Sequence, residues 1–274
     1  MELYKKSRQP LKYLNLLFFA ATLAVNALAN MLPFNGLTTG EASDSFRNLF
    51  APAPITFSIW GVIYLLLGFF VIYQMGWTTV AKRGVSRVTS DLGALFIIAS
   101  AANMAWIYFW HFQELALTIL FMLVLLVSLI GIYLKLRDSR RERSGLQTFI
   151  VDLPFSIYLG WVSVATIANF AAFFVSIEWD AFGLAPEVWT VAVMAVAVLL
   201  GLLSLYRNRD YAYALVVVWA FVGIYLQHRD YWTGQYPMIQ YAAMIGVGVL
   251  VLFGLYVASG VNLVRRGQRN TRRY

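Results

Sequence analysis

The sequence predicts an all-α fold, a polytopic membrane helical bundle with about eight transmembrane helices. Of the 274 residues, 61% are hydrophobic and only 12% are charged, a balance that the surface of a water-soluble globule of this size would not tolerate. Apolar stretches of about 20 residues, the length that crosses the hydrocarbon core of a bilayer, recur along the chain. We expect spans at about residues 12–33, 55–76, 92–111, 114–135, 149–176, 187–205, 211–227 and 238–263.

The basic residues predict how these spans are oriented. The chain has 21 Lys and Arg residues, and cytoplasmic segments of membrane proteins are enriched in both. With eight spans and both termini in the cytoplasm, all of them except Arg47 and Arg229 lie on the cytoplasmic side. We therefore expect an integral protein of a bacterial plasma membrane with a cytoplasmic N-terminus and a cytoplasmic C-terminus.

Composition also excludes several kinds of site. The chain has no Cys and only two His, which excludes disulfides, thiol nucleophiles and Cys- or His-rich metal sites. We expect no metal, no catalytic residue and no required cofactor. The basic residues are scattered between apolar segments, so we expect no nucleic-acid binding. The expected partners are membrane lipid and a hydrophobic small molecule; small residues in the last span, such as Ala242 and Gly246, permit close helix approach and leave a homodimer open.

Three predicted spans each carry aromatic and polar side chains on one helical face. Such faces could enclose a flat, largely apolar pocket with a few polar contacts. Alternatively, the Trp rings pack helices together and the Asn side chains bond across a dry interface. The three stripes are Phe57, Trp60, Tyr64 and Gly68; Asn103, Trp106 and Trp110; and Tyr158, Trp161, Ala165 and Asn169, with Thr166 beside the last.

The same spans carry three motifs that occur in the order expected for one known family. The motifs are Pro52-x-Pro54 followed by Trp60-x-x-x-Tyr64-x-x-x-Gly68, then Asn103-x-x-Trp106, then Trp161-Val162-x-x-Ala165-Thr166-x-x-Asn169. Together they resemble the TspO/translocator-protein family, the tryptophan-rich sensory proteins. The chain is similar to an extended form with additional C-terminal helices. The resemblance covers about residues 12–177, the first five spans.

The resemblance implies a function and a site. Family members bind porphyrins, and some bind sterols or synthetic aromatic ligands, in a pocket between helices under the loop joining the first two. It implies a TspO-like five-helix membrane domain at 1–177, with an additional three-helix region and a basic cytoplasmic tail at 178–274. The expected ligand is a porphyrin or other tetrapyrrole, held between the second, third and fifth spans. With the stripes, the predicted ligand-binding residues are Trp60, Tyr64, Asn103, Trp106, Trp110, Trp161, Ala165, Thr166 and Asn169.

The chain departs from the family pattern in two places. The usual Pro-Pro-x-Trp before the second span is absent, because Ala53 separates Pro52 from Pro54 and the Trp is missing. Pro154 lies seven residues before Trp161, where the family has four, so the start of the fifth span is expected to be bent or offset. Both departures bear on the shape of the pocket mouth.

We expect a receptor or carrier for porphyrin-like or other flat hydrophobic ligands, and two alternatives stay open. The first is a secondary transporter for a small solute, although no repeat or broken mid-membrane helix is evident. Its candidate ionisable residue is Asp152, for which capping or snorkelling competes with a proton relay. The second is an intramembrane enzyme that modifies a bound tetrapyrrole, for which the sequence provides no nucleophile–base pair.

Overall fold

The computed structural model describes residues 9–32, 34–76, 85–139 and 143–270, and the regular structure within these ranges is helical throughout. Eight of these helices are long and apolar enough to cross a membrane. An all-α polytopic membrane bundle is therefore confirmed. The helices that build it are α2 (Gln9–Met31), α3 (Thr39–Asp44), α4 (Ile59–Met75), α5 (Val85–His111), α6 (Leu115–Ser139), α7 (Gly145–Gln147), α8 (Leu153–Ser176), α9 (Pro186–Leu203), α10 (Tyr211–Asp230) and α11 (Pro237–Asn270).

The expected bend at the start of the fifth span is a π-helical turn. This turn, Thr148–Asp152, joins α7 to α8, and the N–H of Leu153 donates to the carbonyl of Thr148 five residues earlier. Pro154 follows immediately and has no N–H with which to continue the α-helical ladder. A single π turn of this kind absorbs the irregularity without ending the helix. The fifth span consequently runs over Gly145–Ser176.

The chain divides into two compact units. The first comprises Met1–Asn48 and Phe57–Trp179, and the second comprises Leu49–Thr56 and Asp180–Tyr274. The first unit holds the first five long helices and the second holds α9, α10 and α11. Nothing in the sequence indicated that Leu49–Thr56, a segment between the first two spans, would belong to the same unit as the last three.

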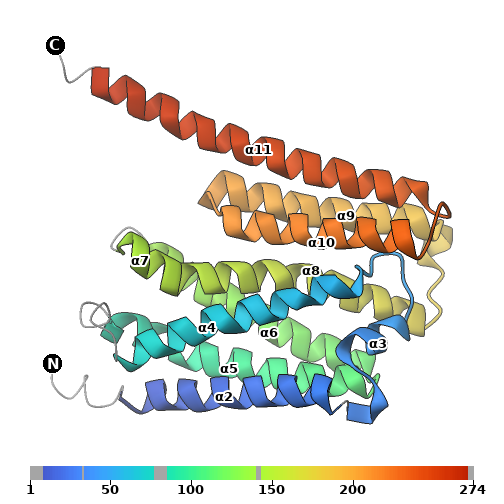
Figure 1. Cartoon of the computed structure of the whole chain (residues 1–274), viewed down its shortest axis with the longest axis horizontal. Helices are drawn as coiled ribbons and strands as arrows, with labels where there is room; N and C mark the ends of the chain where they lie inside the picture. The colour runs from blue at the N-terminus through green and yellow to red at the C-terminus, as the bar shows by residue number, and fades with distance from the viewer. Residues whose placement is uncertain (1–8, 33, 77–84, 140–142, 271–274) are drawn as a thin grey trace. The chain divides into compact units, whose positions relative to one another are not determined.

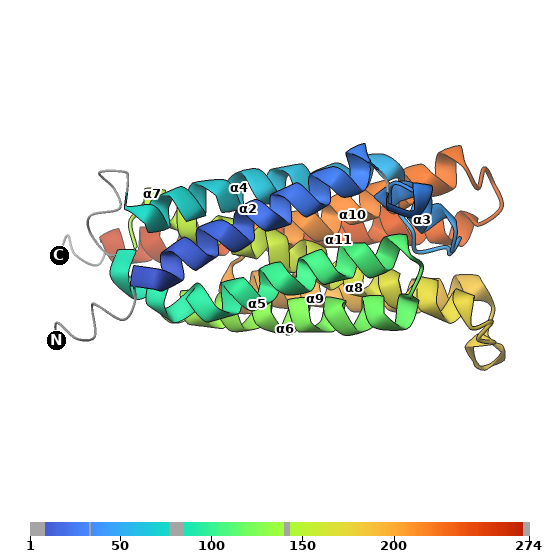
Figure 2. The same ribbon diagram turned by 90° about the horizontal axis from the view of Figure 1, so that it is seen from below.

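The first unit is a closed ring of five helices. Helix α2 packs against both α4 and α5, α6 packs against α5 and α8, and α8 packs against α4. Figure 2 shows α2 between α4 and α5, and Figure 1 shows the same helices from the side. Small residues permit close contacts in the ring: a Cβ at Gly131 of α6 would lie 3.1 Å from Leu95 of α5. Such spacing is typical of helix pairs in membranes.

The second unit packs α11 against both α9 and α10. A Cβ at Gly201 would lie 2.7 Å from Leu250, and one at Gly246 would collide with Phe221. Gly246 therefore serves close packing inside this unit. The homodimer stays a prediction.

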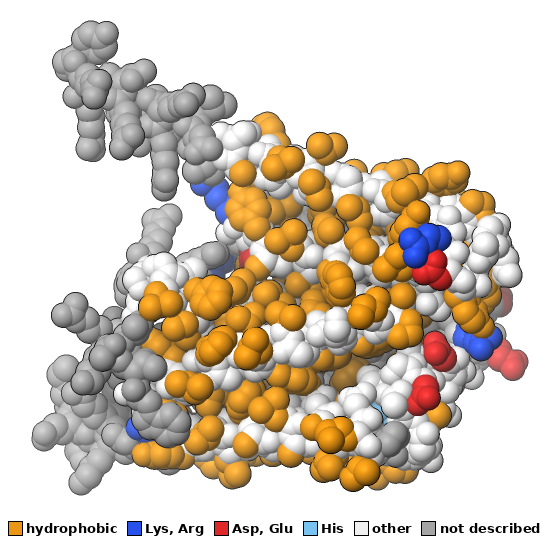
Figure 3. All heavy atoms as spheres, viewed as in Figure 1, with side chains coloured by type: hydrophobic (Ala, Val, Ile, Leu, Met, Phe, Trp, Pro, Cys, Tyr) orange, Lys and Arg blue, Asp and Glu red, His pale blue; other side chains and the backbone are white. Residues whose placement is uncertain are grey.

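The surface of the helices is apolar. On the face drawn in Figure 3, hydrophobic side chains cover the helices and the coloured charged side chains lie near the helix ends. Large side chains such as Leu17, Leu65 and Leu252 are more than half exposed. Exposed apolar surface on this scale fits contact with lipid acyl chains.

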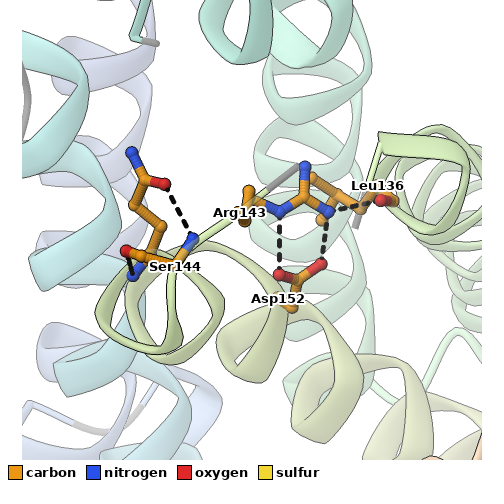
Figure 4. Close-up of polar contacts among 5 residues, drawn as sticks. Leu136, Arg143, Ser144 and Asp152 are labelled. Atoms are coloured by element: carbon orange, nitrogen blue, oxygen red, sulfur yellow. Dashed lines mark hydrogen bonds and ion pairs between the residues drawn. The ribbon is translucent and has the colours of Figure 1, made fainter. Parts of the chain in front are cut away.

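A buried ion pair fixes the start of α8. Arg143 donates from Nε to Asp152 Oδ2 at 2.9 Å and from its terminal nitrogen to Oδ1 at 2.6 Å, and also to the carbonyl of Leu136 at the end of α6 (Figure 4). Both side chains are about nine-tenths buried, with 7% and 10% exposed. The bidentate geometry joins α6 to α8 across the loop between them.

We expect Arg143→Met to destabilise the protein by about 3–5 kcal/mol, because it leaves a buried carboxylate without its cation. The double variant Arg143→Met with Asp152→Leu should recover most of that loss, since neither charge is then buried alone. Thermal unfolding in one detergent, compared between the single and double variants, measures both effects. Equal destabilisation of the two would contradict the assignment.

Candidate functional site

The side-chain amide of Asn103 is the centre of a polar network inside the first unit. Asn103, on α5, is fully buried. Its Oδ1 accepts hydrogen bonds from Asn26 Nδ2 at 2.8 Å and Tyr64 Oη at 3.3 Å, and its Nδ2 donates to Tyr158 Oη at 3.1 Å. The partners come from α2, α4 and α8. One amide therefore connects four of the five helices of the ring.

Aromatic rings gather around Trp60 on α4. Tyr64 stacks on it with centroids 5.6 Å apart and planes at 20°. Trp106 lies at 5.6 Å, and Tyr158 and Trp161 meet its ring edge to face at 5.7 and 6.2 Å. Such arrangements are favourable aromatic geometries. The three predicted stripes therefore do meet at one place.

Two tryptophans of α5 make specific hydrogen bonds through their indole N–H groups. Trp106 donates to Asn169 Oδ1 on α8 at 3.1 Å, and Trp110 donates to the carbonyl of Thr39 on α3 at 3.1 Å. The two rings also stack on each other, 6.2 Å apart. Both side chains are buried. They join α5 to α8 and to the short helix α3.

The predicted residues of α8 are buried inside the first unit. Trp161 is 2% exposed and contacts Trp60 and Phe57, and its Nε1 has no hydrogen-bond partner. Ala165 is buried, and its carbonyl accepts from Asn169 Nδ2 at 2.8 Å. Thr166 donates back to the carbonyl of Val162 at 2.6 Å. Together these residues pack and bond inside the ring.

A cavity of about 480 Å³ is lined by Trp60 together with residues of α2. Its volume falls in the range of small-molecule sites, roughly 300–1,000 Å³. Apolar and amide side chains of α2 contribute much of its wall. The lining residues are Leu23, Asn26, Ala27, Asn30, Met31, Thr39, Phe57, Trp60, Gly61, Tyr64 and Ile107.

Of the nine residues predicted to bind a ligand, Trp60 and Tyr64 line this cavity and the others do not. Sequence reasoning missed the contribution of α2. A signal was present, because Asn26 and Asn30 are four residues apart in an apolar span and so share a helical face. Polar side chains at that spacing inside a membrane indicate a packed or cavity-lining face.

The helix that carries Thr39 begins with a capping box. Thr38 and Glu41 bond reciprocally, side chain to backbone. Hydrogen bonds donated by the backbone N–H and the hydroxyl of Thr38 hold the pKa of the Glu41 carboxyl below its ordinary value. The Thr39 hydroxyl itself is buried without a partner. The box therefore holds a cavity-lining residue in a defined helical turn.

No group of three or more His, Asp or Glu side chains that could hold a metal ion occurs in the part of the chain that the structure describes. The cavity instead offers aromatic faces, amides and hydroxyls. Groups of this kind recognise an organic molecule by stacking and hydrogen bonding.

The fold and the cavity define a class: a polytopic helical membrane protein with an aromatic-walled cavity in a five-helix ring. The sequence matches a family model described as TSPO-like protein over residues 12–256. The chain belongs to this family. The match runs well past residue 177 and covers the sixth and seventh spans and most of the eighth, Pro237–Gly260. Neither the search of curated proteins nor that of solved structures found a match.

Asn103→Ala should destabilise the protein by about 2 kcal/mol, because it removes three hydrogen bonds between helices, each worth roughly 0.6 kcal/mol in a membrane. Asn30→Ala is the matched control, since Asn30 is exposed and donates only to the carbonyl of Asn26 on its own helix. Thermal unfolding in detergent compares the two. A loss for Asn103→Ala no larger than that of the control would contradict the role of the network.

Proposed function

We propose that this protein is a membrane receptor or carrier that binds porphyrin-like or other flat hydrophobic molecules. The observation that carries the proposal is the stacked pair Trp60 and Tyr64, which presents aromatic surface to a cavity of about 480 Å³. A planar ring system gains both apolar burial and stacking on such a wall. Membership of the TSPO-like family supports the same class of ligand.

The cavity pairs this aromatic wall with polar groups. Asn26 and Tyr64 donate to Asn103, and Asn30 donates to the carbonyl of Asn26. The Oδ1 atoms of Asn26 and Asn30 remain as acceptors for a ligand N–H or O–H. Apolar side chains such as Leu23 and Met31 complete the lining. This combination fits a largely apolar ligand with a few polar substituents.

Several of the other predicted residues contact side chains that line the cavity. Trp106 and Trp161 contact the ring of Trp60, and Asn103 accepts from Tyr64. Side chains held on several sides lose little further freedom when a ligand binds. Ala165, Thr166 and Asn169 extend this support along α8.

Two alternative functions were a secondary transporter and an intramembrane enzyme. The transporter would use Asp152 as its ionisable group. Its carboxylate forms a bidentate ion pair with Arg143, which favours a structural role. The enzyme would need a nucleophile beside a base, and the cavity lining contains neither His nor a carboxylate. Ligand binding is therefore the function that the site supports best.

Filling the cavity should weaken binding. A Cβ at Gly61 would meet nothing within 4 Å, so Gly61→Leu can occupy cavity space without a clash in the protein. We expect at least a ~10-fold higher Kd for protoporphyrin IX, equivalent to about 1.4 kcal/mol. Titration of the purified protein, followed by porphyrin absorbance and Trp quenching, measures it.

The matched control is Gly248→Leu on α11, where an added Cβ also meets nothing within 4 Å. Its Kd should equal that of the wild type. No saturable signal from the wild type would refute the proposed function. An unchanged Kd for Gly61→Leu would refute this cavity as the site.

We further propose that the membrane is a bacterial plasma membrane and that both termini are cytoplasmic, as the distribution of basic residues indicates. The chain lacks Cys, so single cysteines can report orientation. An impermeant maleimide should label Leu184→Cys in intact cells, and Leu146→Cys only after permeabilisation. The reverse pattern would contradict the orientation.

A further inference from the structure

The segment Leu49–Thr56 lies against α10 within the second unit. Three hydrogen bonds hold it there: Ala53 N donates to the carbonyl of Gly223 at 3.0 Å, Trp219 Nε1 donates to the carbonyl of Thr56 at 3.0 Å, and His228 Nε2 donates to the carbonyl of Leu49 at 2.9 Å. The bonds are spread over the whole segment. Each joins positions more than 160 residues apart in the sequence.

The segment approaches α10 most closely at Gly223. A Cβ at position 223 would collide with the hydroxyl of Thr56 and would lie 2.9 Å from Cβ of Pro52. Only glycine permits so close an approach. Pro52 and Pro54 have no backbone N–H, so Ala53 supplies the one donor of this triplet, and that donor meets the carbonyl of Gly223.

Neighbouring aromatic rings orient the side chain of His228 for its hydrogen bond to Leu49. Its side chain is fully buried, and its ring stacks with Trp232 and meets Tyr236 edge to face. A carbonyl can only accept, so Nε2 carries the proton and His228 is oriented as a donor to Leu49. Gln240 of α11 donates to the backbone carbonyl of His228 at 2.9 Å.

The segment is also joined directly to the cavity wall by the chain itself. Thr39 precedes it and Phe57 follows it, and both line the cavity. Thr56 and Phe57 belong to the same short 3-10 helix, Pro54–Ser58. A bond that fixes the carbonyl of Thr56 therefore restrains the next residue, whose ring packs edge to face on Trp161, 6.0 Å away.

We propose that Trp219, Gly223 and His228 are positioning residues for the ligand cavity: they hold Leu49–Thr56 on α10 and thereby limit how fast a ligand enters and leaves. This inference rests on the proposed function. In this proposal a ligand passes Phe57 as it enters and leaves the cavity, so loosening the segment speeds both association and dissociation. The ratio of the two rates, and hence Kd, changes much less.

The test uses Trp219→Phe, which removes one donor and keeps a ring, and Gly223→Ala, which displaces the segment. Gly248→Ala is the control. In stopped-flow experiments with protoporphyrin IX, we expect both rate constants to rise roughly three- to tenfold in the two variants, the size expected for loss of one hydrogen bond. Kd should stay within about threefold of the wild-type value.

A second readout does not depend on ligand. Ile55 is 60% exposed, and in a chain without Cys a spin label on Ile55→Cys reports on this segment alone. Label mobility should increase with Trp219→Phe and Gly223→Ala and not with Gly248→Ala. If Gly223→Ala does not fold, Trp219→Phe still decides the question.

The outcomes separate the two proposals. Saturable porphyrin binding with wild-type rates in Trp219→Phe overturns the positioning role and leaves the proposed function standing. Unchanged label mobility in Trp219→Phe overturns it as well. A wild-type protein that shows no saturable binding overturns the proposed function, and this inference with it.

Discussion

The buried amide of Asn103 is the interaction on which the ring of five helices depends. In the apolar interior of a membrane, an amide without partners costs several kcal/mol, so α5 requires polar partners at one level of the bundle. Asn26, Tyr64 and Tyr158 supply them from α2, α4 and α8. Because Asn26 and Tyr64 also line the cavity, the bonds that satisfy Asn103 fix the side chains that a ligand would meet.

This arrangement reconciles two interpretations of the Trp stripes. Packing of helices and enclosure of a pocket were alternatives at the level of sequence, yet the structure assigns them to different rings. Trp106 and Trp161 are buried and pack against Trp60, whereas Trp60 itself is half-buried and lines the cavity. A ring that is held by neighbouring rings and also lines a cavity is suited to stacking, since its orientation is set before a ligand arrives.

The spans, their order and the meeting of the three stripes could be predicted, because length, hydropathy and helical spacing are local properties of the chain. The cavity wall on α2 could not be predicted in the same way. Asn26 and Asn30 revealed a polar face, but spacing does not say which helix that face meets. That depends on the closed ring, in which α2 lies between α4 and α5. The α2 residues that line the cavity include no aromatic side chain, so the aromatic stripes gave no indication of them.

The contact between Leu49–Thr56 and α10 could not be predicted from the sequence, because it joins distant parts of the chain. It also explains a departure from the family pattern. With consecutive prolines, as in the usual Pro-Pro-x-Trp, the residue at position 53 would lack the N–H that meets the carbonyl of Gly223. Ala53 provides that N–H, and Gly223 leaves room for Pro52 and Thr56. The interrupted proline pair before the second span and the glycine in the seventh are thus complementary. Both lie within the family match at residues 12–256, so the segment and the helix that holds it belong to the part of the chain that the family model describes.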